Sequence, residues 1–196
     1  MAILILFALL FSGPALGHSG DFENVERAIS GFGFVQGLLH PIQGMDHLLA
    51  MLCVGLISSK IGKRAIWQVP ACFVVVMAIG CVFGFFGSAS AFIEPMIAAS
   101  VIVFGLLLVL PFQMKFWLTL LTVGLFAAVH GYAHGKEMPL FVLPEVYIIG
   151  FMTATTVVHV VGVGIGEVTN RLRFSATLYR ITGIALVISG IYFIVA

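Results

Sequence analysis

The 196-residue sequence contains few charged residues: Asp, Glu, Lys and Arg make up 9% of it, while 61% of the residues are hydrophobic. Soluble domains devote about a quarter of their residues to these four types, so a water-soluble globular enzyme is excluded. The formal net charge is only +1, which excludes a nucleic-acid-binding protein that relies on a basic face. High hydrophobicity also excludes an intrinsically disordered chain. The composition therefore predicts an integral membrane protein.

Cysteine is scarce, and a nucleotide-binding loop is missing from the sequence. The three cysteines, Cys53, Cys72 and Cys81, fall inside apolar segments, and their odd number argues against a disulfide framework. No G-x-x-x-x-G-K-[ST] motif is found, so ATP binding of the P-loop kind is excluded. No separate soluble domain is expected either.

The N-terminal segment, residues 1–17, contains an apolar run of about ten residues that is broken by a Gly-Pro pair. A transmembrane helix needs about 20 apolar residues, so this run is short for a span. The small residues that follow it are typical of a signal-peptidase site. We predict a signal peptide over residues 1–17. The apolar run is not preceded by Lys or Arg, which leaves a retained first helix as the alternative.

Long apolar segments follow, and they predict an all-α protein, because a helix satisfies its own backbone hydrogen bonds within a membrane. A first, less regular segment runs from Gly31 to Ile57, and Pro41 and Gly44 predict a break within it. Together the segments predict one domain, residues 18–196, with six transmembrane helices. The five regular segments are Ile66–Phe86, Ile93–Leu110, Phe116–Val129, Val146–Gly164 and Ala176–Val195.

Basic residues are unevenly distributed among the predicted loops. Cytoplasmic loops carry an excess of Lys and Arg, so the more basic side is predicted to face the cytoplasm. The mature N-terminus and C-terminus then lie outside. Six basic residues follow the first, third and fifth spans, namely Lys60, Lys63, Arg64, Lys115, Arg171 and Arg173.

Histidine is the unusual residue of this chain, with six copies against eight carboxylates. An ionisable group inside a span costs about 3 kcal/mol on insertion scales, so it is a functional hypothesis by default. The topology places five histidines and two carboxylates in spans or at their outer ends, and we expect them to gather in the outer half of one bundle. These candidate metal-binding residues are His40, Asp46, His47, His130, His134, Glu137 and His159.

The spacing of these residues supports a metal site. His130 and His134 are four residues apart and Glu137 follows after three, so a continuing helix places all three on one face. His40 and His47 are seven apart, about 10 Å along a straight helix. Either the break near Pro41 brings these two rings together, or they mark two successive sites. Broken helices commonly build the binding sites of transporters.

The types of side chain restrict the metal. Neutral imidazoles with a few carboxylates suit borderline divalent ions such as Ni²⁺, Co²⁺, Zn²⁺ and Cu²⁺. Mg²⁺ and Ca²⁺ prefer shells made only of oxygen. The residues themselves leave the choice among the borderline ions open.

Two motifs resemble those of a known family, the HupE/UreJ proteins. Residues 40–47, HPIQGMDH, resemble the H-P-x-x-G-x-D-H signature of that family, and residues 130–137, HGYAHGKE, resemble its H-G-x-A-H-G-x-E motif. Residues 155–162, around His159, are similar to its later histidine-bearing helix. The resemblance covers essentially the whole mature chain.

The resemblance implies a secondary permease of the bacterial inner membrane for nickel or cobalt, which supplies nickel enzymes such as hydrogenase and urease. It implies that the seven candidate residues bind the metal as transported substrate, with no tightly bound cofactor and no catalysis. The expected partners are the divalent ion and the lipid bilayer, with no nucleic acid, and a homo-oligomer is left open. A role for His18 in chelation is also left open.

Three alternatives belong to other classes. A membrane-embedded zinc hydrolase could use the same His and Asp cluster around an open coordination position. A haem-binding anchor would use paired histidines on facing helices, although Asp46 beside His47 fits such a pair poorly. In a scaffold protein, the histidines would only form hydrogen bonds between helices.

Overall fold

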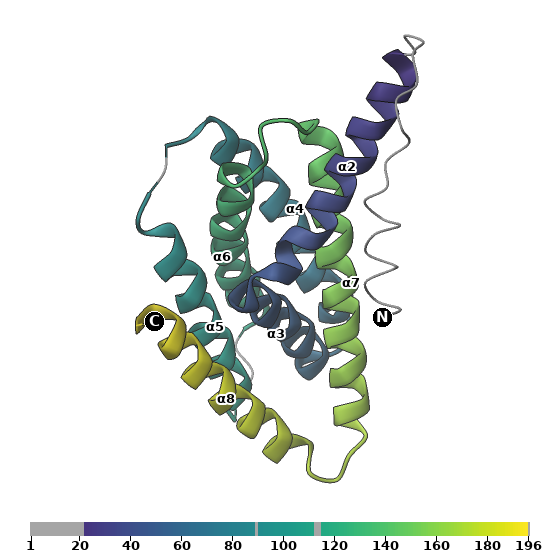
Figure 1. Ribbon diagram of the computed structural model, residues 1–196. Helices are drawn as coiled ribbons and strands as arrows, with labels where there is room; N and C mark the ends of the chain where they lie inside the picture. The colour runs from purple at the N-terminus through teal and green to yellow at the C-terminus, as the bar shows by residue number, and fades with distance from the viewer. Residues whose placement is uncertain (1–21, 89, 112–114, 196) are drawn as a thin grey trace, which may run out of the picture.

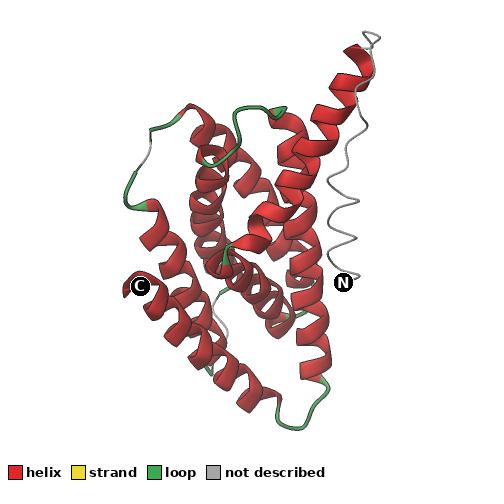
Figure 2. Ribbon diagram, viewed as in Figure 1, coloured by secondary structure: helices red, strands yellow, loops and turns green. Residues whose placement is uncertain are grey.

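The structure is a computed structural model, and it describes residues 22–88, 90–111 and 115–195. The predicted signal peptide, residues 1–17, and His18 lie outside the described residues. The described part forms seven helices and contains no strand, so the all-α prediction is confirmed for it (Figures 1 and 2). The helices are α2 (Phe22–Gln43), α3 (Met45–Ile61), α4 (Ala65–Phe86), α5 (Ile93–Val109), α6 (Phe116–Lys136), α7 (Pro144–Asn170) and α8 (Ser175–Val195).

The predicted break in the first span is confirmed. Helix α2 ends at Gln43, Gly44 has extended backbone angles, and α3 begins at Met45. The two helices meet at an angle of 83°. Pro41 lies in the last turn of α2, where its missing N–H removes one helical hydrogen bond. The chain therefore turns sharply between His40 and His47, as Figure 1 shows for α2 and α3.

Four of the described helices, α4, α6, α7 and α8, are long and apolar enough to cross a membrane. The bent pair of α2 from Gly31 onward with α3 adds a fifth candidate span if it is counted as one. Helix α5 is apolar but has 17 residues. These helices are consistent with a multi-pass membrane protein, while the count of six spans stays a prediction.

Helices α6 and α7 extend beyond the C-terminal limits predicted from hydropathy. Helix α6 continues seven residues past Val129, to Lys136, and α7 continues past Gly164 to Asn170. The predicted limits followed the apolar run, but the helices continue through polar residues that are buried, such as His130 and His134. In α6 these residues are buried against neighbouring helices, while at the end of α7 Glu167 and Asn170 form hydrogen bonds with Ser59 of α3. Tertiary contacts, rather than hydrophobicity alone, therefore stabilise the helical conformation of these turns.

Helix α3 occupies the centre of the bundle (Figure 1), and most of its residues from His47 onward are buried. At its C-terminal end, Ser59 donates to Glu167 over 2.6 Å. The Lys60 ammonium donates to three carbonyls at the end of α5, at 2.8–2.9 Å. Tyr179 on α8 donates to Asn170 on α7 over 2.9 Å. This polar network joins α3, α5, α7 and α8 at the end of the bundle away from the α2–α3 break.

Small residues bring specific helices into close backbone contact. A Cβ atom added at Gly84 on α4 would overlap the backbone carbonyl of Tyr132 on α6, and one added at Gly131 would overlap that of Met77. Such close approach is the usual role of glycine between membrane helices. The same kind of contact joins α2 to α7 at Gly37 and Gly150, α3 to α7 at Gly55 and Gly162, and α5 to α8 at Gly105, Gly183 and Gly190.

We expect Gly84→Ala to lower the thermal stability of the detergent-solubilised protein, because α4 and α6 must move apart to admit the methyl group. Gly164→Ala is the matched control: no atom lies within 4 Å of a Cβ there, and alanine is favoured over glycine in a helix by about 1 kcal/mol. It should leave the melting temperature unchanged or raise it. Equal melting temperatures for the two variants would contradict the close packing of α4 on α6.

Candidate metal site

His130 lies on α6 with its ring buried and its protonation pattern fixed. Its Nδ1 lies 2.9 Å from the carbonyl oxygen of Phe126, one turn earlier. A carbonyl oxygen only accepts, so Nδ1 carries the hydrogen, and Nε2 of the neutral ring holds a free lone pair. That is the form of imidazole that binds a metal.

Asp46 fixes His47 in the same way at the start of α3. One carboxylate oxygen, Oδ1, accepts from the backbone N–H of His47 at 2.8 Å and lies 3.0 Å from its Nδ1. The ionised carboxylate accepts, so Nδ1 of His47 donates and Nε2 is left with its lone pair. Gly44 makes room for this pair, since a Cβ there would lie 3.0 Å from Nδ1 of His47. A carboxylate behind a histidine is the usual support of a metal ligand.

His40 connects α2 to the end of α6. Its Nε2 lies 2.8 Å from Oε2 of Glu137, which follows the last residue of α6. This hydrogen bond lowers the pKa of the Glu137 carboxyl, so the group remains ionised at neutral pH. It is also 42% exposed, which makes it accessible to a cation from solvent.

Four histidine rings pack against one another. His134 contacts His40 at a ring-centroid distance of 4.9 Å and His47 at 5.2 Å, and His47 contacts His130 at 4.9 Å. The rings come from α2, α3 and α6. Imidazoles at this separation in a buried setting form one cluster of nitrogen donors, which we call the histidine cluster: His40, His47, His130 and His134.

Several nitrogens of these rings have no hydrogen-bond partner in the described structure. They are Nε2 of His47, Nε2 of His130 and both ring nitrogens of His134. Buried polar atoms are nearly always hydrogen-bonded, and an unsatisfied one costs about 1–3 kcal/mol. These ring nitrogens are therefore donors and acceptors that remain available to a ligand.

The cluster is not a ready-made chelate. Among the described residues, no three His, Cys, Asp or Glu side chains are already arranged to hold a metal ion. The rings pack edge to face or tilted against one another, and three ligating atoms are not directed at one point among the described residues. Binding a cation there requires rearrangement of these rings. His134 can rotate without losing a hydrogen bond, because neither of its nitrogens has a partner in the described part of the chain, whereas His40, His47 and His130 are each held by one.

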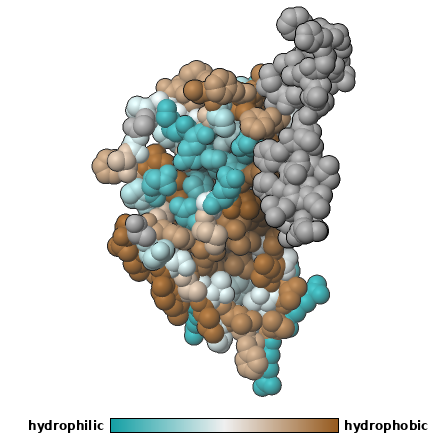
Figure 3. All heavy atoms as spheres, viewed as in Figure 1, coloured by the Kyte–Doolittle hydropathy of each residue, from teal (hydrophilic) through white to brown (hydrophobic). Residues whose placement is uncertain are grey.

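A polar cavity of about 180 Å³ adjoins the cluster. His40, Asp46, His47 and Glu137 line it, and so does Glu94 from the first turn of α5. Figure 3 shows hydrophilic residues gathered on this face between α6 and α2, with hydrophobic residues around and below them. The cavity therefore combines three carboxylates with two imidazoles at the surface of the bundle.

His159 lies apart from the cluster. The residue is 1% exposed, and its ring packs against that of Phe73 at a centroid distance of 5.0 Å. The Phe73 ring also contacts the ring of His130, at a centroid distance of 5.4 Å. Phe73, fully buried on α4, thus separates His159 from the histidine cluster. Both nitrogens of His159 also lack a hydrogen-bond partner.

Comparison with known proteins places the chain in a family. The family model described as HupE / UreJ protein matches residues 6–193. The chain belongs to the HupE/UreJ family. It is similar to Protein HupE from Rhizobium leguminosarum bv. viciae, with 38% identity over 161 residues, which is 81% of this chain and 82% of that protein. No solved structure matches it significantly.

In this HupE/UreJ protein, six of the seven predicted residues come together. His40, Asp46, His47 and Glu137 line the polar cavity, and His130 and His134 lie behind it. The expectation that all five histidines gather was wrong for His159. It faces α4 from the adjacent helix α7, and the intervening Phe73 ring fills the space between the two groups.

Sequence analysis missed three residues of this HupE/UreJ site. Glu94 lies in a sequence typical of an ordinary helix start, although an acidic residue at the end of a span could have indicated a place in the site. Phe73 resembled any apolar residue of a span. Tyr147 is fully buried with its hydroxyl unpartnered, and its ring lies 5.9 Å from His40. Its position on α7 gave no sign of that proximity.

Proposed function

We propose that this HupE/UreJ protein is a secondary transporter that takes up a divalent transition-metal cation across the bacterial inner membrane, and that this cation is Ni²⁺. The observation that carries the proposal is the pair His47 and His130. Each ring uses Nδ1 in a hydrogen bond and keeps a buried Nε2 without a partner, and the rings are 4.9 Å apart. Borderline divalent ions are the cations that neutral imidazole prefers.

The proposed entry is the polar cavity. Glu94 lies in the first turn of α5 and Glu137 follows α6, so both lie at the end of the bundle opposite the basic loops, the end predicted to face outside. The carboxylates of Glu94, Glu137 and Asp46 attract the hydrated cation. His40 and His47 then replace some of its waters, because their rings line the same cavity.

The proposed second step passes the cation from the cavity to His130 and His134. The rings of His47 and His134 are 5.2 Å apart, so a small rotation exchanges one imidazole ligand for another. An inside-negative potential favours inward movement of a divalent ion by about 4.6 kcal/mol per 100 mV, twice the value for a single charge. Uptake then needs no ATP, and the metal would supply nickel enzymes such as hydrogenase or urease.

Proteoliposomes test this proposal directly. Vesicles containing the protein, with an inside-negative potential, should accumulate ⁶³Ni²⁺ faster than empty vesicles, and unlabelled Co²⁺ should compete better than Mg²⁺. Accumulation no faster than in empty vesicles would refute transport of nickel. Equal competition by Mg²⁺ would refute selection by imidazole.

Substitution of Glu137 tests the proposed capture of the cation at the polar cavity. We expect Glu137→Gln to raise the Ni²⁺ concentration for half-maximal uptake by about tenfold while leaving the maximal rate nearly unchanged, since an accessible charge is lost but the histidine cluster is kept. Glu145→Gln, in the exposed first turn of α7, is the matched control and should behave like wild type. An identical shift in both variants would mean that Glu137 acts only through general surface charge.

A further inference from the structure

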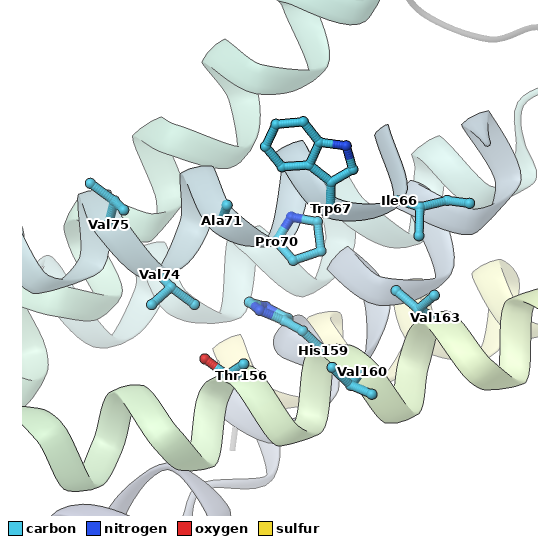
Figure 4. A pocket seen from close by; sticks show the side chains of 10 residues that line it. All are labelled: Ile66, Trp67, Pro70, Ala71, Val74, Val75, Thr156, His159, Val160 and Val163. Atoms are coloured by element: carbon cyan, nitrogen blue, oxygen red, sulfur yellow. The ribbon is translucent and has the colours of Figure 1, made fainter. Parts of the chain in front are cut away.

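A second cavity, of about 520 Å³, lies between α4 and α7. Figure 4 shows the ring of His159 pointing from α7 toward α4, with Pro70 and Val74 opposite it and Thr156 beside it. Ligand sites of proteins commonly have volumes of about 300–1,000 Å³, mostly apolar walls and a few placed polar groups. This cavity has that character, and the polar cavity described above does not share its walls.

His159 supplies the hydrogen-bonding capacity of this cavity. Its side chain is 1% exposed, and neither ring nitrogen has a partner in the described structure. The neutral ring has one N–H donor and one lone-pair acceptor. The hydroxyl group of Thr156, which also lines the wall, already donates to the carbonyl of Met152 over 2.7 Å. A hydroxyl group, which both donates and accepts, matches what His159 leaves unsatisfied.

The lining requires an uncharged ligand. Besides His159, Thr156 and the indole N–H of Trp67, the lining residues are apolar, and Asp, Glu, Lys and Arg are not among them. A charged group would be buried here without a counter-charge, at a large desolvation cost. The same argument makes the cavity unsuitable for a metal cation.

The position of the opening indicates where the ligand comes from. Trp67 and Val160, at the cavity wall, are 63% and 64% exposed, and in a membrane these apolar surfaces contact lipid. His159 is the sixteenth residue of α7, about 22 Å along the helix from its start at 1.5 Å per residue. A polar group reaches this depth only when an apolar molecule carries it there.

We propose that the cavity between α4 and α7 binds a neutral, bilayer-soluble molecule with an apolar body and a single hydroxyl group, which hydrogen-bonds to His159. This site is separate from the metal pathway and does not depend on it, because Phe73 lies between His159 and the histidine cluster. The ligand enters from the lipid between Trp67 and Val160.

Tryptophan fluorescence provides the test, since the chain has two tryptophans and one of them, Trp67, lines the cavity. In a Trp117→Phe variant, Trp67 is the sole tryptophan, and a brominated ligand in contact with it quenches its emission. The probes are 11-bromo-1-undecanol, 1-bromoundecane and 11-bromoundecanoic acid at pH 8. The alcohol should quench saturably, at a half-saturating concentration at least tenfold below that of the other two.

Two further proteins complete the experiment. His159→Leu, made in the Trp117→Phe background, should raise the half-saturating concentration of the alcohol to that of the bromoalkane. Trp67→Phe, which leaves Trp117 on α6, should be quenched equally by the alcohol and the bromoalkane, since that residue does not line the cavity. Equal quenching of Trp67 by the alcohol and the bromoalkane would overturn the proposal, and this comparison needs no change at His159. Stronger quenching by the acid would overturn the requirement for a neutral ligand.

Discussion

His47→Ala is expected to abolish saturable Ni²⁺ uptake. The ring of His47 lies at the centre of the histidine cluster, 4.9 Å from His130 and 5.2 Å from His134. It also lines the polar cavity, so its loss removes the side chain that belongs to both steps of the proposed pathway. Loss of a supporting residue behind a ligand typically lowers metal affinity by about 10–100-fold, and loss of the ligand itself should cost more than about 100-fold.

The measurement is ⁶³Ni²⁺ uptake as a function of concentration in proteoliposomes, together with equilibrium binding to the purified protein. His159→Leu is the matched control, because that histidine is also buried but lies beyond Phe73. It should keep the half-saturating Ni²⁺ concentration within about twofold of wild type. Normal uptake by His47→Ala would show that His47 is not a ligand of the transported metal. Loss of uptake in both variants would show that His159 also belongs to the transport pathway.

Asp46→Asn is expected to weaken Ni²⁺ binding by about 10–100-fold while the protein stays folded. The asparagine oxygen can still accept from the backbone N–H of His47, as Oδ1 of Asp46 does at 2.8 Å. The neutral amide, however, no longer increases the electron density of the imidazole or stabilises the positive charge of a bound cation. The substitution therefore separates the electrostatic role of Asp46 from its part in the fold.

Binding of Ni²⁺ to the purified variant and its melting temperature without metal are the two readouts. Glu145→Gln again controls for loss of one negative charge, since that residue is not in the cavity wall. Wild-type affinity in Asp46→Asn would show that the carboxylate only orients His47. A large fall in melting temperature would show that it mainly supports the start of α3.

Patterns within one helix were predicted well from sequence. The spacing of His130 and His134 predicted that they share a face of α6, and their contacts with His40 and His47 lie on that face. The Pro41–Gly44 segment predicted the break, because proline and glycine act on the local backbone. The motif residues themselves identified six side chains that the fold brings together.

Relations between helices were not predictable in the same way. Nothing in the spacing of residues 73, 130 and 159 shows that one aromatic ring lies between two histidines. The sequence around Glu94 has the features of a helix start, and Glu94 does lie in the first turn of α5. Its place in the cavity wall depends on the packing of other helices, which these features do not show. The hydropathy limits at Val129 and Gly164 were wrong because tertiary contacts compensate for polar side chains. On α6 these contacts bury His130 and His134, and on α7 they are hydrogen bonds of Glu167 and Asn170 with Ser59. Predicted spans and the signal peptide stay predictions.

The close glycine contacts divide the bundle into three tightly packed groups: α4 with α6, α7 with α2 and α3, and α5 with α8. Each group contributes to the site: His130, His134 and Glu137 come from or follow α6, His40, Asp46 and His47 from α2 and α3, and Glu94 from α5. A cation bound by these residues would join the three helix groups, which pack less extensively against one another than the helices within each group do. Small relative displacements of whole groups would then change the coordination number of the ion, and its affinity with it, while every helix keeps its own closest neighbour.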